Sequence, residues 1–480
     1  MTKTHLSFLL MLVLMAGVYP ITATAQNGED HVATSIEARG ADYAAVARQI
    51  WEWAEVGYQE NQSAALLQAE LEKAGFTTEA GVAGIPTAFV ASYGQGEPVI
   101  GILAEYDALP GLSQEAVPER QAKIKDGAGH GCGHHLFGTA STAAAIAVKD
   151  WLAETGQPGT IRLYGTPAEE GGAGKVYMVR EGLFDDVDVV LHWHPGDRND
   201  ASPSTSLANR SAKFRFHGLS THAAGAPERG RSALDGVEAM NLMVNMLREH
   251  VPSDTRIHYV ITRGGFAPNV VPDFAEVYYY VRHPSAETLE GIFERVVKAG
   301  EGAAVGTGTR MEYEIIHGIH SVLPNEALAR LVDANLRRVG GITYSPEEQA
   351  FAEDIRETLG SPSLPLGSEK TIQPFIPRTT KGSTDVGDVS WMVPTAGFGT
   401  ATWVPGTSAH SWQAVAAGGM GIGTKGMLLA AKTLALTAID LFSDPAHREA
   451  ARQEFEERRG PDFEYRALLG DRPPPLDYRK

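Results

Sequence analysis

The feature that most constrains this chain is its single cysteine, which lies in a run of glycines and histidines. Cys132 is the only cysteine among 480 residues, so the chain cannot form an internal disulfide. The surrounding segment, 129–135, reads Gly-His-Gly-Cys-Gly-His-His. A thiolate beside imidazoles is a ligand set that suits zinc and other divalent transition metals. The segment predicts a metal site whose remaining ligands come from elsewhere in the chain.

Two further clusters of ligand-type residues follow along the chain. The first carries Glu169 and Glu170 directly before two glycines. Neighbouring carboxylates can divide the work of a hydrolytic site, one binding metal and the other moving protons. The second carries His192 and His194, which share one face of an expected strand because they are two residues apart. We expect one of these two histidines to bind metal.

Two isolated residues have more than one interpretation. Asp107 follows an apolar segment, Pro98–Ala104, so it lies at the carboxyl end of an expected strand, where open α/β sheets place their sites. A turn or helix cap is an equally compatible role for this aspartate. His410 lies in a loop before the last helix. It is an ordinary surface histidine unless a two-metal site recruits it as one more ligand.

The order of expected strands and helices predicts an α/β fold, with a sheet covered by helices on both faces. The pattern changes near Ala208, where an alternating strand, 212–217, and an amphipathic helix, 231–250, begin an α+β insert. The expected domains are therefore 26–207 with 319–480, and an inserted domain, 208–318. The charged, proline-rich segment from Asp444 is expected to be a surface extension.

The first 25 residues have the layout of a secretory signal peptide. Lys3 precedes an apolar run, Leu6–Val18, and Ala23-Thr-Ala25 offers a cleavage site. The run is shorter than the ~20 apolar residues of a membrane span, although an uncleaved anchor is the alternative. We expect a mature chain that begins near Gln26, is periplasmic or secreted, and has no membrane contact after cleavage.

The charge of the chain narrows the class of partner. A net charge of −18, from 41 basic and 59 acidic residues, opposes binding to nucleic acid or to an anionic membrane through a basic field. A small anionic substrate is compatible with this charge if a local arginine or histidine holds it. We therefore expect a small-molecule partner.

Six motifs together resemble the metallopeptidase family 20 amidohydrolases, in particular their aminobenzoyl-glutamate hydrolase-like branch. The family includes aminoacylases and indole-acetyl-amino-acid hydrolases, and the resemblance runs from about Tyr43 to Leu436. The motifs are Ala104–Ser113, Gly131–His134, Pro167–Gly171, Trp193–Pro195, Ser220–Ala223 and Ala409–Ser411. The implied fold is a catalytic domain with a mixed sheet flanked by helices and an inserted α+β lid or dimerisation domain.

The resemblance implies a catalytic centre with two divalent metal ions, zinc or manganese, as cofactors. It makes Glu169 the general base that deprotonates a water between the metals, and Asp107 a residue that orients the metal ligands. His192 stays the alternative to His194, since it lies two residues earlier on the same strand. The implied ligands are Cys132, His134, Glu170, His194 and His410.

The resemblance also assigns roles to the insert and implies a homodimer. His222 would reach the partner subunit's site and stabilise the tetrahedral oxyanion. Asn269 would support the substrate and Arg282 would bind its free carboxylate; for Arg282, an ion pair with a neighbouring acid is the alternative.

The expected activity is metal-dependent hydrolysis of the amide bond of N-acyl amino acids similar to aminobenzoyl-glutamate. The alternative within enzymes is a dipeptidase or carboxypeptidase that acts on short peptides. A binding or metal-storage protein is a further alternative, but binding alone does not need the second carboxylate, Glu169. A structural component of a hetero-oligomer is the last alternative.

Overall fold

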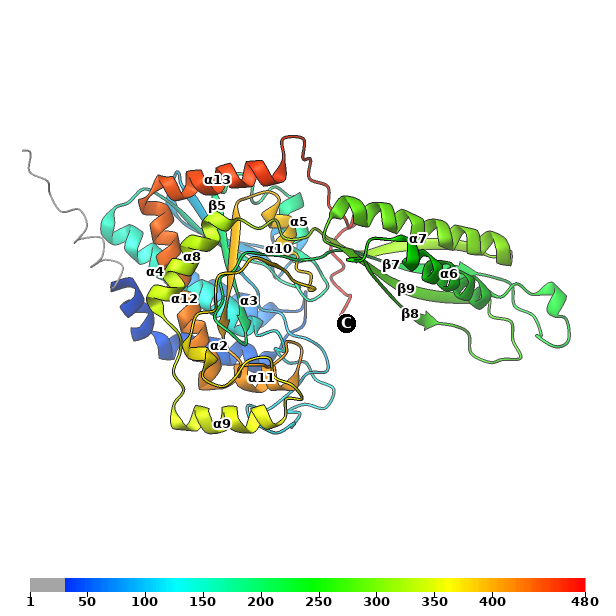
Figure 1. Cartoon of the computed structure of the whole chain (residues 1–480), viewed down its shortest axis with the longest axis horizontal. Helices are drawn as coiled ribbons and strands as arrows, with labels where there is room; N and C mark the ends of the chain where they lie inside the picture. The colour runs from blue at the N-terminus through cyan, green and yellow to red at the C-terminus, as the bar shows by residue number, and fades with distance from the viewer. Residues whose placement is uncertain (1–30, 480) are drawn as a thin grey trace, which may run out of the picture.

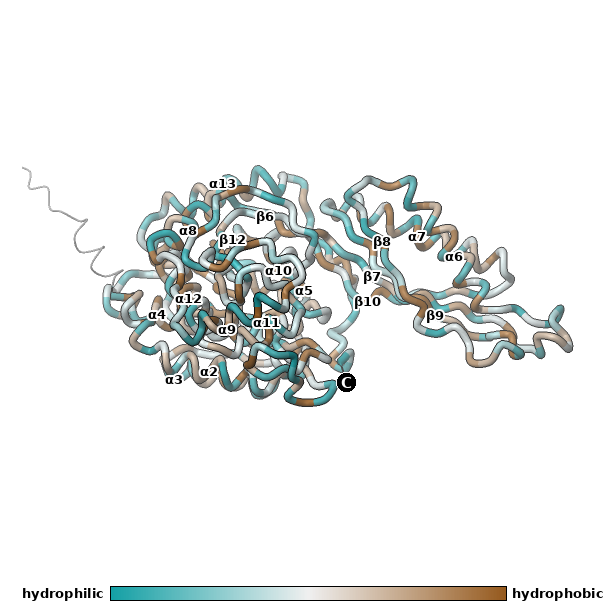
Figure 2. The backbone as a smooth tube through the Cα atoms, turned by 60° about the horizontal axis from the view of Figure 1, so that its bottom comes forward, coloured by the Kyte–Doolittle hydropathy of each residue, from teal (hydrophilic) through white to brown (hydrophobic). Residues whose placement is uncertain are grey.

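This computed structural model describes residues 31–479, which contain a six-stranded β-sheet, a four-stranded β-sheet and a short sheet of two strands, β6 (Ser204–Thr205) and β11 (Arg378–Thr379). The signal peptide expected at residues 1–25 lies outside the described residues. We call the six-stranded sheet with its helices the inner lobe, and residues 208–319, with the four-stranded sheet, the outer lobe. Figure 1 shows the outer lobe projecting from one side of the inner lobe, and Figure 2 shows the same separation from another direction.

The sheet of the inner lobe is mixed, with the strand order β1-β2-β4-β3-β5-β12. The strands β4, β3, β5 and β12 run parallel, while β2 is antiparallel to both β1 and β4. This sheet confirms the predicted α/β fold class. The strands are β1 (Thr77–Ala80), β2 (Phe89–Gln95), β3 (Val99–Ala104), β4 (Gly159–Gly165), β5 (Val189–Gly196) and β12 (Thr395–Ala401).

Helices cover both faces of this sheet because successive strand residues point to opposite sides. Ile100 and Ile102 of β3 pack under one layer of helices, whereas Val99 and Leu103 pack under the other. The first layer contains α2 (Gly40–Trp53), α3 (Asn61–Lys73), α4 (His134–Thr155), α8 (Glu326–Val339), α9 (Pro346–Glu357), α11 (Trp412–Gly418) and α12 (Gly421–Ser443). The second contains α5 (Gly174–Arg180) and α10 (Val386–Ser390).

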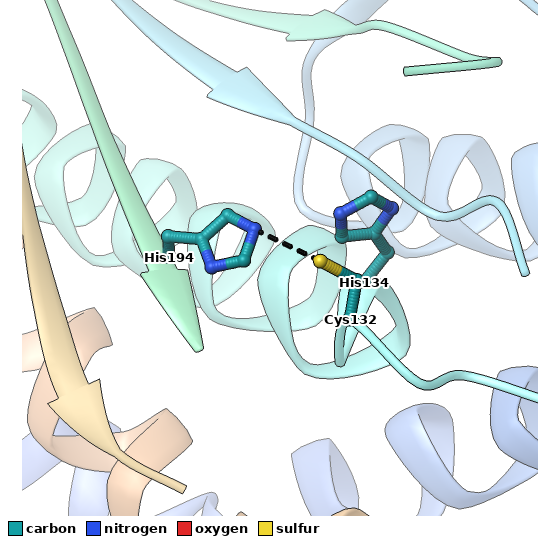
Figure 3. A group of neighbouring side chains, drawn as sticks. All are labelled: Cys132, His134 and His194. Carbon is teal, nitrogen blue, oxygen red and sulfur yellow. Dashed lines mark hydrogen bonds between the residues drawn. The ribbon is translucent and has the colours of Figure 1, made fainter. Parts of the chain in front are cut away.

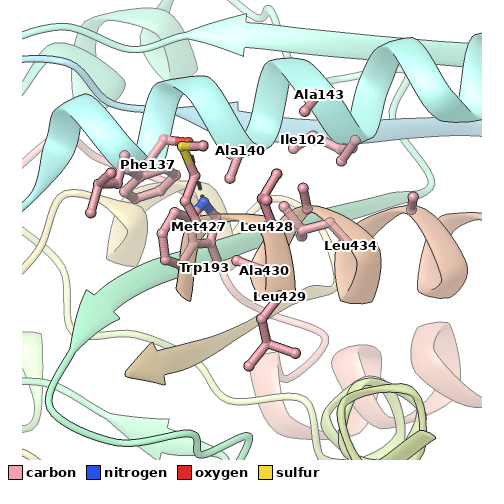
Figure 4. Packing of buried hydrophobic residues seen from close by; sticks show 14 of the residues in the cluster. Ile102, Phe137, Ala140, Ala143, Trp193, Met427, Leu428, Leu429, Ala430 and Leu434 are labelled. Atoms are coloured by element: carbon pink, nitrogen blue, oxygen red, sulfur yellow. Dashed lines mark hydrogen bonds between the residues drawn. The ribbon is translucent and has the colours of Figure 1, made fainter. Parts of the chain in front are cut away.

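Helix α4 packs against α12 in the core of the inner lobe (Figure 4). Small side chains such as Ala140 and Ala430 let the two helices approach closely, and both are fully buried. The indole of Trp193 on β5 donates a hydrogen bond of 3.2 Å to the carbonyl of Phe137 on α4. Helix α12 is long and apolar enough to cross a membrane by composition, but 83% of its most apolar window is buried in this core.

The outer lobe is an antiparallel sheet with two helices on one face. Its strand order is β10-β7-β9-β8, with β8 at one edge. Helices α6 (Ala233–Leu247) and α7 (Ala286–Thr307) begin at the serine caps Ser232 and Ser285 and cover Phe214 and Val277 of the sheet. The strands are β7 (Ala208–His217), β8 (Arg256–Arg263), β9 (Phe274–His283) and β10 (Arg310–Ile319).

The end of the chain is not the surface extension expected from its composition. Helix α13 (Pro445–Arg459) packs on the inner lobe through Ala451 and Phe455. Residues 460–479, which we call the connecting segment, then pass between the two lobes (Figure 1). Arg472 donates hydrogen bonds of 2.6 and 2.8 Å to two backbone carbonyls of β10. The expectation failed because Arg472 and Arg479 bind backbone carbonyls and because Leu468 and Leu469 are buried.

Candidate active site

The carboxyl ends of parallel strands position most of the predicted site residues. Glu105 and Asp107 follow β3, Glu169 and Glu170 follow β4, and His194 lies near the end of β5. Parallel strands end at the same edge of a sheet, so side chains from distant parts of the sequence meet there.

Cys132, His134 and His194 form the first group of possible metal ligands (Figure 3). Their ligand atoms all lie within 4.8 Å of one another. Cys132 Sγ lies 3.4 Å from His194 Nε2, and His194 Nδ1 lies 2.7 Å from the carbonyl of Pro195. A proton on Nδ1 would satisfy this carbonyl and leave the Nε2 lone pair directed at the cysteine. Gly133, with φ of 74°, permits the turn because a Cβ there would lie 2.6 Å from Pro195.

Cys132, Glu170 and His410 form a second group, also within 4.8 Å. His410 Nε2 lies 3.2 Å from Glu170 Oε1. The loop that carries His410 is fixed to the cysteine loop, because the His410 amide donates a hydrogen bond of 2.9 Å to the Gly131 carbonyl. Cys132 thus belongs to both groups, which is the arrangement of a site that can hold two cations side by side.

Asp107 supports one residue of each group. Its Oδ1 atom lies 2.8 Å from His134 Nδ1, and its Oδ2 atom accepts a hydrogen bond of 2.9 Å from the Glu170 amide. Although burial opposes the charge, Asp107 and Glu105 raise the pKa of His134. The aspartate lies where it can orient a histidine ligand and the backbone of a carboxylate ligand together.

The residues present fit divalent cations. Glu105 Oε2, His134 Nε2 and Glu170 Oε1 are buried and have no hydrogen-bond partner among residues 31–479. His134 Nε2 nevertheless lies 3.1 Å from Glu105 Oε2. Lone-pair atoms brought together without hydrogen bonds are stabilised by a positive ion between them. Burial raises the pKa of the Cys132 thiol, and a bound cation would reverse that effect by favouring the thiolate.

Glu169 lies among these residues and lines the adjoining cavity. Its carboxylate lies within 4.8 Å of ligand atoms of Glu105 and His134. Burial, and then the negative charges of Glu105 and Glu170, raise the pKa of Glu169 well above its usual value. A carboxyl group that takes up a proton readily is suited to general acid–base chemistry.

The other histidines of the sequence clusters lie outside the two groups. His192 packs against Gly397 and lines the cavity, but it belongs to none of the ligand groups among the described residues. His130 and His135 are buried, and each has its Nε2 atom near a backbone carbonyl, at 3.2 and 3.0 Å. The geometry therefore brings His194, and not His192, to Cys132.

Sequence reasoning missed a buried ion-pair network beside the site. Lys175 Nζ lies 2.7 Å from Glu105 Oε1 and 2.8 Å from Asp385 Oδ1, and all three side chains are buried. The same approach overlooked Glu60, whose carboxylate accepts a hydrogen bond of 2.8 Å from the Ala168 amide. A lysine in the first turn of α5, directly before the apolar run Val176–Val179, was the available sequence clue.

The predicted residues of the outer lobe are divided between two places. His222 and Asn269 are exposed and adjacent through a 3.0 Å hydrogen bond from the Ala223 amide to the Asn269 carbonyl. Neither residue belongs to the ligand groups or lines the adjoining cavity. His222 Nδ1 accepts hydrogen bonds from two backbone amides, which leaves Nε2–H as a free donor. Arg282 instead lines the same cavity as the metal ligands.

This cavity has a volume of about 1300 Å³ and lies between the two lobes. Its inner wall carries Cys132, Glu169 and His410. Its outer wall is the face of the outer sheet that α6 and α7 leave uncovered, with Tyr278, Tyr280 and Arg282 in alternate positions of β9. A volume of this size accommodates a small organic substrate.

Comparison with known proteins gives consistent matches. The model of the peptidase family M20/M25/M40 matches residues 101–374. The chain is 43% identical to one of the subunits of the p-aminobenzoyl-glutamate hydrolase of Escherichia coli, over 88% of this chain and 94% of that protein. It is 30% identical to the Xaa-Arg dipeptidase of Mus musculus, over 86% of this chain and 88% of that protein.

The fold also matches a solved structure of a dinuclear metal-binding peptidase of the M20 family, the YXEP protein of Bacillus subtilis. That comparison has a TM-score of 0.58 and covers 85% of this chain and 99% of the solved chain, at 19% identity. A likeness at this identity shows the fold alone.

Proposed function

Because the chain belongs to the peptidase family M20/M25/M40, we propose that it hydrolyses the amide bond of N-acyl amino acids similar to p-aminobenzoyl-glutamate. Membership of the family confirms the resemblance carried by the motifs and makes the chain a metal-dependent amidohydrolase. The observation that carries the proposed hydrolysis is Glu169, which lies beside two overlapping ligand groups at the wall of a substrate-sized cavity. The substrate class is supported by the similarity to the p-aminobenzoyl-glutamate hydrolase.

The proposed cofactors are two divalent metal ions, zinc or manganese. Bound metal would polarise the amide carbonyl and lower the pKa of the attacking water. Cys132, His134 and His194 would hold one ion, and Cys132, Glu170 and His410 the other. Because Cys132 belongs to both groups, the two sites would lie next to each other.

The proposed proton transfers belong to Glu169. Its carboxylate takes a proton from the attacking water and donates one to the departing nitrogen, so that the amine leaves neutral. The high proton affinity that burial gives this carboxyl group favours the first transfer. Asp107 acts through the ligands, because its two oxygens fix the ring of His134 and the amide of Glu170.

The proposed role of residues 208–318 is a lid and dimerisation domain of a homodimer. The edge strand β8 and the outer face of α6 expose apolar side chains, among them Leu242, Met246, Val260 and Ile261. An unpaired edge strand next to exposed apolar side chains favours association with a second copy. In such a dimer, His222 would supply its free Nε2–H to the oxyanion in the partner subunit's site, with Asn269 beside it.

Two alternatives follow from the relatives. Activity on dipeptides is favoured by the similarity to an Xaa-Arg dipeptidase, a weaker similarity than the one to the hydrolase of Escherichia coli. The name of that hydrolase chain describes a protein that is one component of a larger enzyme. A requirement for a second kind of chain is therefore the other alternative, and activity of the purified single chain would exclude it.

We also propose that the protein is exported. The support is the apolar run Leu6–Val18 followed by Ala23-Thr-Ala25. Mass spectrometry of the N-terminus of the chain in a periplasmic extract tests this proposal. Absence of the chain from that extract would contradict export, and a chain there that retains Lys3 would contradict cleavage.

The central test is hydrolysis by the purified chain. We expect release of glutamate from p-aminobenzoyl-glutamate, loss of this activity after chelation, and its recovery when zinc or manganese is added back. A panel of dipeptides, assayed by mass spectrometry under the same conditions, tests the alternative that the enzyme is a dipeptidase. Faster turnover of dipeptides than of every N-acyl amino acid tested would replace the proposed function with that alternative.

A further inference from the structure

Six basic side chains line the cavity, and four of them have a carboxylate partner. A cation already paired with a carboxylate has little left to offer an anionic ligand. The pairs are Arg198 with Asp197 at 2.7 Å, Lys213 with Glu276 at 3.7 Å, Arg472 with Glu314 at 3.8 Å, and Arg378 with Asp200. The remaining two, Arg282 and Arg479, form no ion pair with the described residues.

Arg282 is the first of these two free cations. It is half-buried on β9, with its guanidinium 5.4 Å from the centre of the Tyr280 ring. Its Nε atom is buried and has no hydrogen-bond acceptor among the residues that the structure describes. This environment suits the binding of one substrate carboxylate, the role that the family resemblance implies.

Arg479 is the second free cation, and the connecting segment fixes its position. One Nη atom donates a hydrogen bond of 2.6 Å to the Glu170 carbonyl, and the guanidinium lies 5.0 Å from the centre of the Tyr478 ring. Its Nε atom is buried and has no acceptor in the described part of the chain. A guanidinium has five N–H donors, so most of its donors remain available beside a metal-ligand loop.

The neighbours of Arg479 hold the segment firmly in place. The Tyr478 ring contacts the Tyr58 ring edge-on at 5.6 Å, and Gln59 donates a hydrogen bond of 2.8 Å to the Leu476 carbonyl. Because the guanidinium is fixed before a ligand arrives, little conformational entropy is lost when an anion binds.

We propose that Arg479 binds a second carboxylate of the substrate, so that the enzyme prefers N-acyl derivatives of dicarboxylic amino acids. This inference rests on the proposed function and adds a substrate class and a specificity-determining residue to it. With Arg282 on the α-carboxylate, an acyl-glutamate or acyl-aspartate satisfies both free cations. A neutral side chain leaves the Arg479 guanidinium partly buried and unpaired, which disfavours binding.

The test compares two substrates that differ in one charge, N-(4-aminobenzoyl)-L-glutamate and N-(4-aminobenzoyl)-L-glutamine. We expect Arg479→Gln to lower kcat/KM for the glutamate compound by about 10- to 100-fold, mainly through KM. The glutamine compound should change only a few-fold, and Arg479→Lys should restore part of the preference. Arg466→Gln is the matched control, because the Arg466 side chain is in the same segment but 85% exposed.

Two outcomes would overturn the inference. Equal losses for both substrates in Arg479→Gln would assign the residue a structural role, and a wild-type enzyme without preference would remove the substrate class. Calorimetric binding of both compounds to a Glu169→Gln protein separates this test from turnover. If the wild type hydrolyses neither compound, the proposed function fails. A binding preference for the glutamate compound that Arg479→Gln abolishes would still support the anion site, and its absence would refute it.

Discussion

Glu169 is the residue on which the proposed proton transfers depend. It is the one carboxylate of the Glu169–Glu170 pair that belongs to neither cysteine-containing ligand group. Burial raises the pKa of Glu169, and metal ions bound at the neighbouring ligand groups would lower it by favouring the ionised carboxylate. Such a group can accept and return a proton within one catalytic cycle.

Replacing this carboxylate by an amide should separate proton transfer from metal binding. We expect Glu169→Gln to lower kcat by about 10²- to 10⁴-fold, the usual contribution of a general base, while the metal content per chain stays unchanged. Steady-state kinetics and elemental analysis of the same sample measure both quantities. Glu181→Gln, at an exposed position after α5, is the control. Wild-type turnover in Glu169→Gln would remove the assigned base.

Several site residues could be predicted because their types are rare and their neighbours are glycines. Cys132, Glu170 and His410 meet in the structure as the sequence clusters indicated. The choice between His192 and His194 could not be made from sequence, because both lie on the same strand face. The structure decides it, because the His192 ring lies against Gly397 of the neighbouring strand β12.

At the scale of elements, Lys175 joins three of them. Its ammonium group on α5 lies between Glu105, which follows β3, and Asp385, which precedes α10. Two acids and one base are all buried there, so the network is stable only while each charge keeps its partner. No periodic pattern reports such a network, since its members are far apart in the sequence. That distance is why sequence reasoning missed it.

Removing this lysine should destabilise the inner lobe. We expect Lys175→Met to lower the free energy of unfolding by about 3–5 kcal/mol, because two buried carboxylates lose their cation. Denaturant titrations in the presence of a chelator measure this without a contribution from metal binding. Adding Asp385→Asn to Lys175→Met should recover part of the loss. Lys73→Met, at an exposed site on α3, is the control. Equal stability of the Lys175 and Lys73 variants would contradict the argument.

The elements themselves were the most predictable part of the fold. Strands and helices that alternate in a buried sheet leave a clear apolar pattern, and the change of pattern near Ala208 coincides with the start of β7. The connecting segment was not predictable, because its arginines donate hydrogen bonds to backbone carbonyls 156 to 309 residues away in the sequence. The composition predicts that charged side chains such as Arg472 and Arg479 are exposed to solvent, whereas in the structure they bind backbone carbonyls.

At the scale of the whole molecule, the proposed dimer would complete each site with a histidine from the other subunit. Mixing Glu169→Gln with His222→Ala proteins tests this directly. In a mixed dimer, one site keeps its own Glu169 and receives an intact His222 from the partner. After random exchange of equal amounts, half of the dimers are mixed and one of the two sites in each is complete. We therefore expect about one quarter of the wild-type activity per site.

Each parent protein measured alone is the control for this exchange, and both should be nearly inactive. Turnover should rise with the time allowed for exchange, followed by continuous assay of glutamate release. A mixture that never exceeds the sum of its parents would refute the contribution in trans. Near-normal activity of His222→Ala alone would remove the oxyanion role altogether.

The connecting segment has a mechanical consequence for the cycle of turnover. It is fastened to β10 of the outer lobe through Arg472 and to the Glu170 carbonyl through Arg479. If the lobes rotate to admit substrate or release product, the tether must stretch, slide or detach at one of these anchors. Opening of the cavity to substrate and the position of the Glu170 carboxylate are thus coupled. A shorter connecting segment would restrict both.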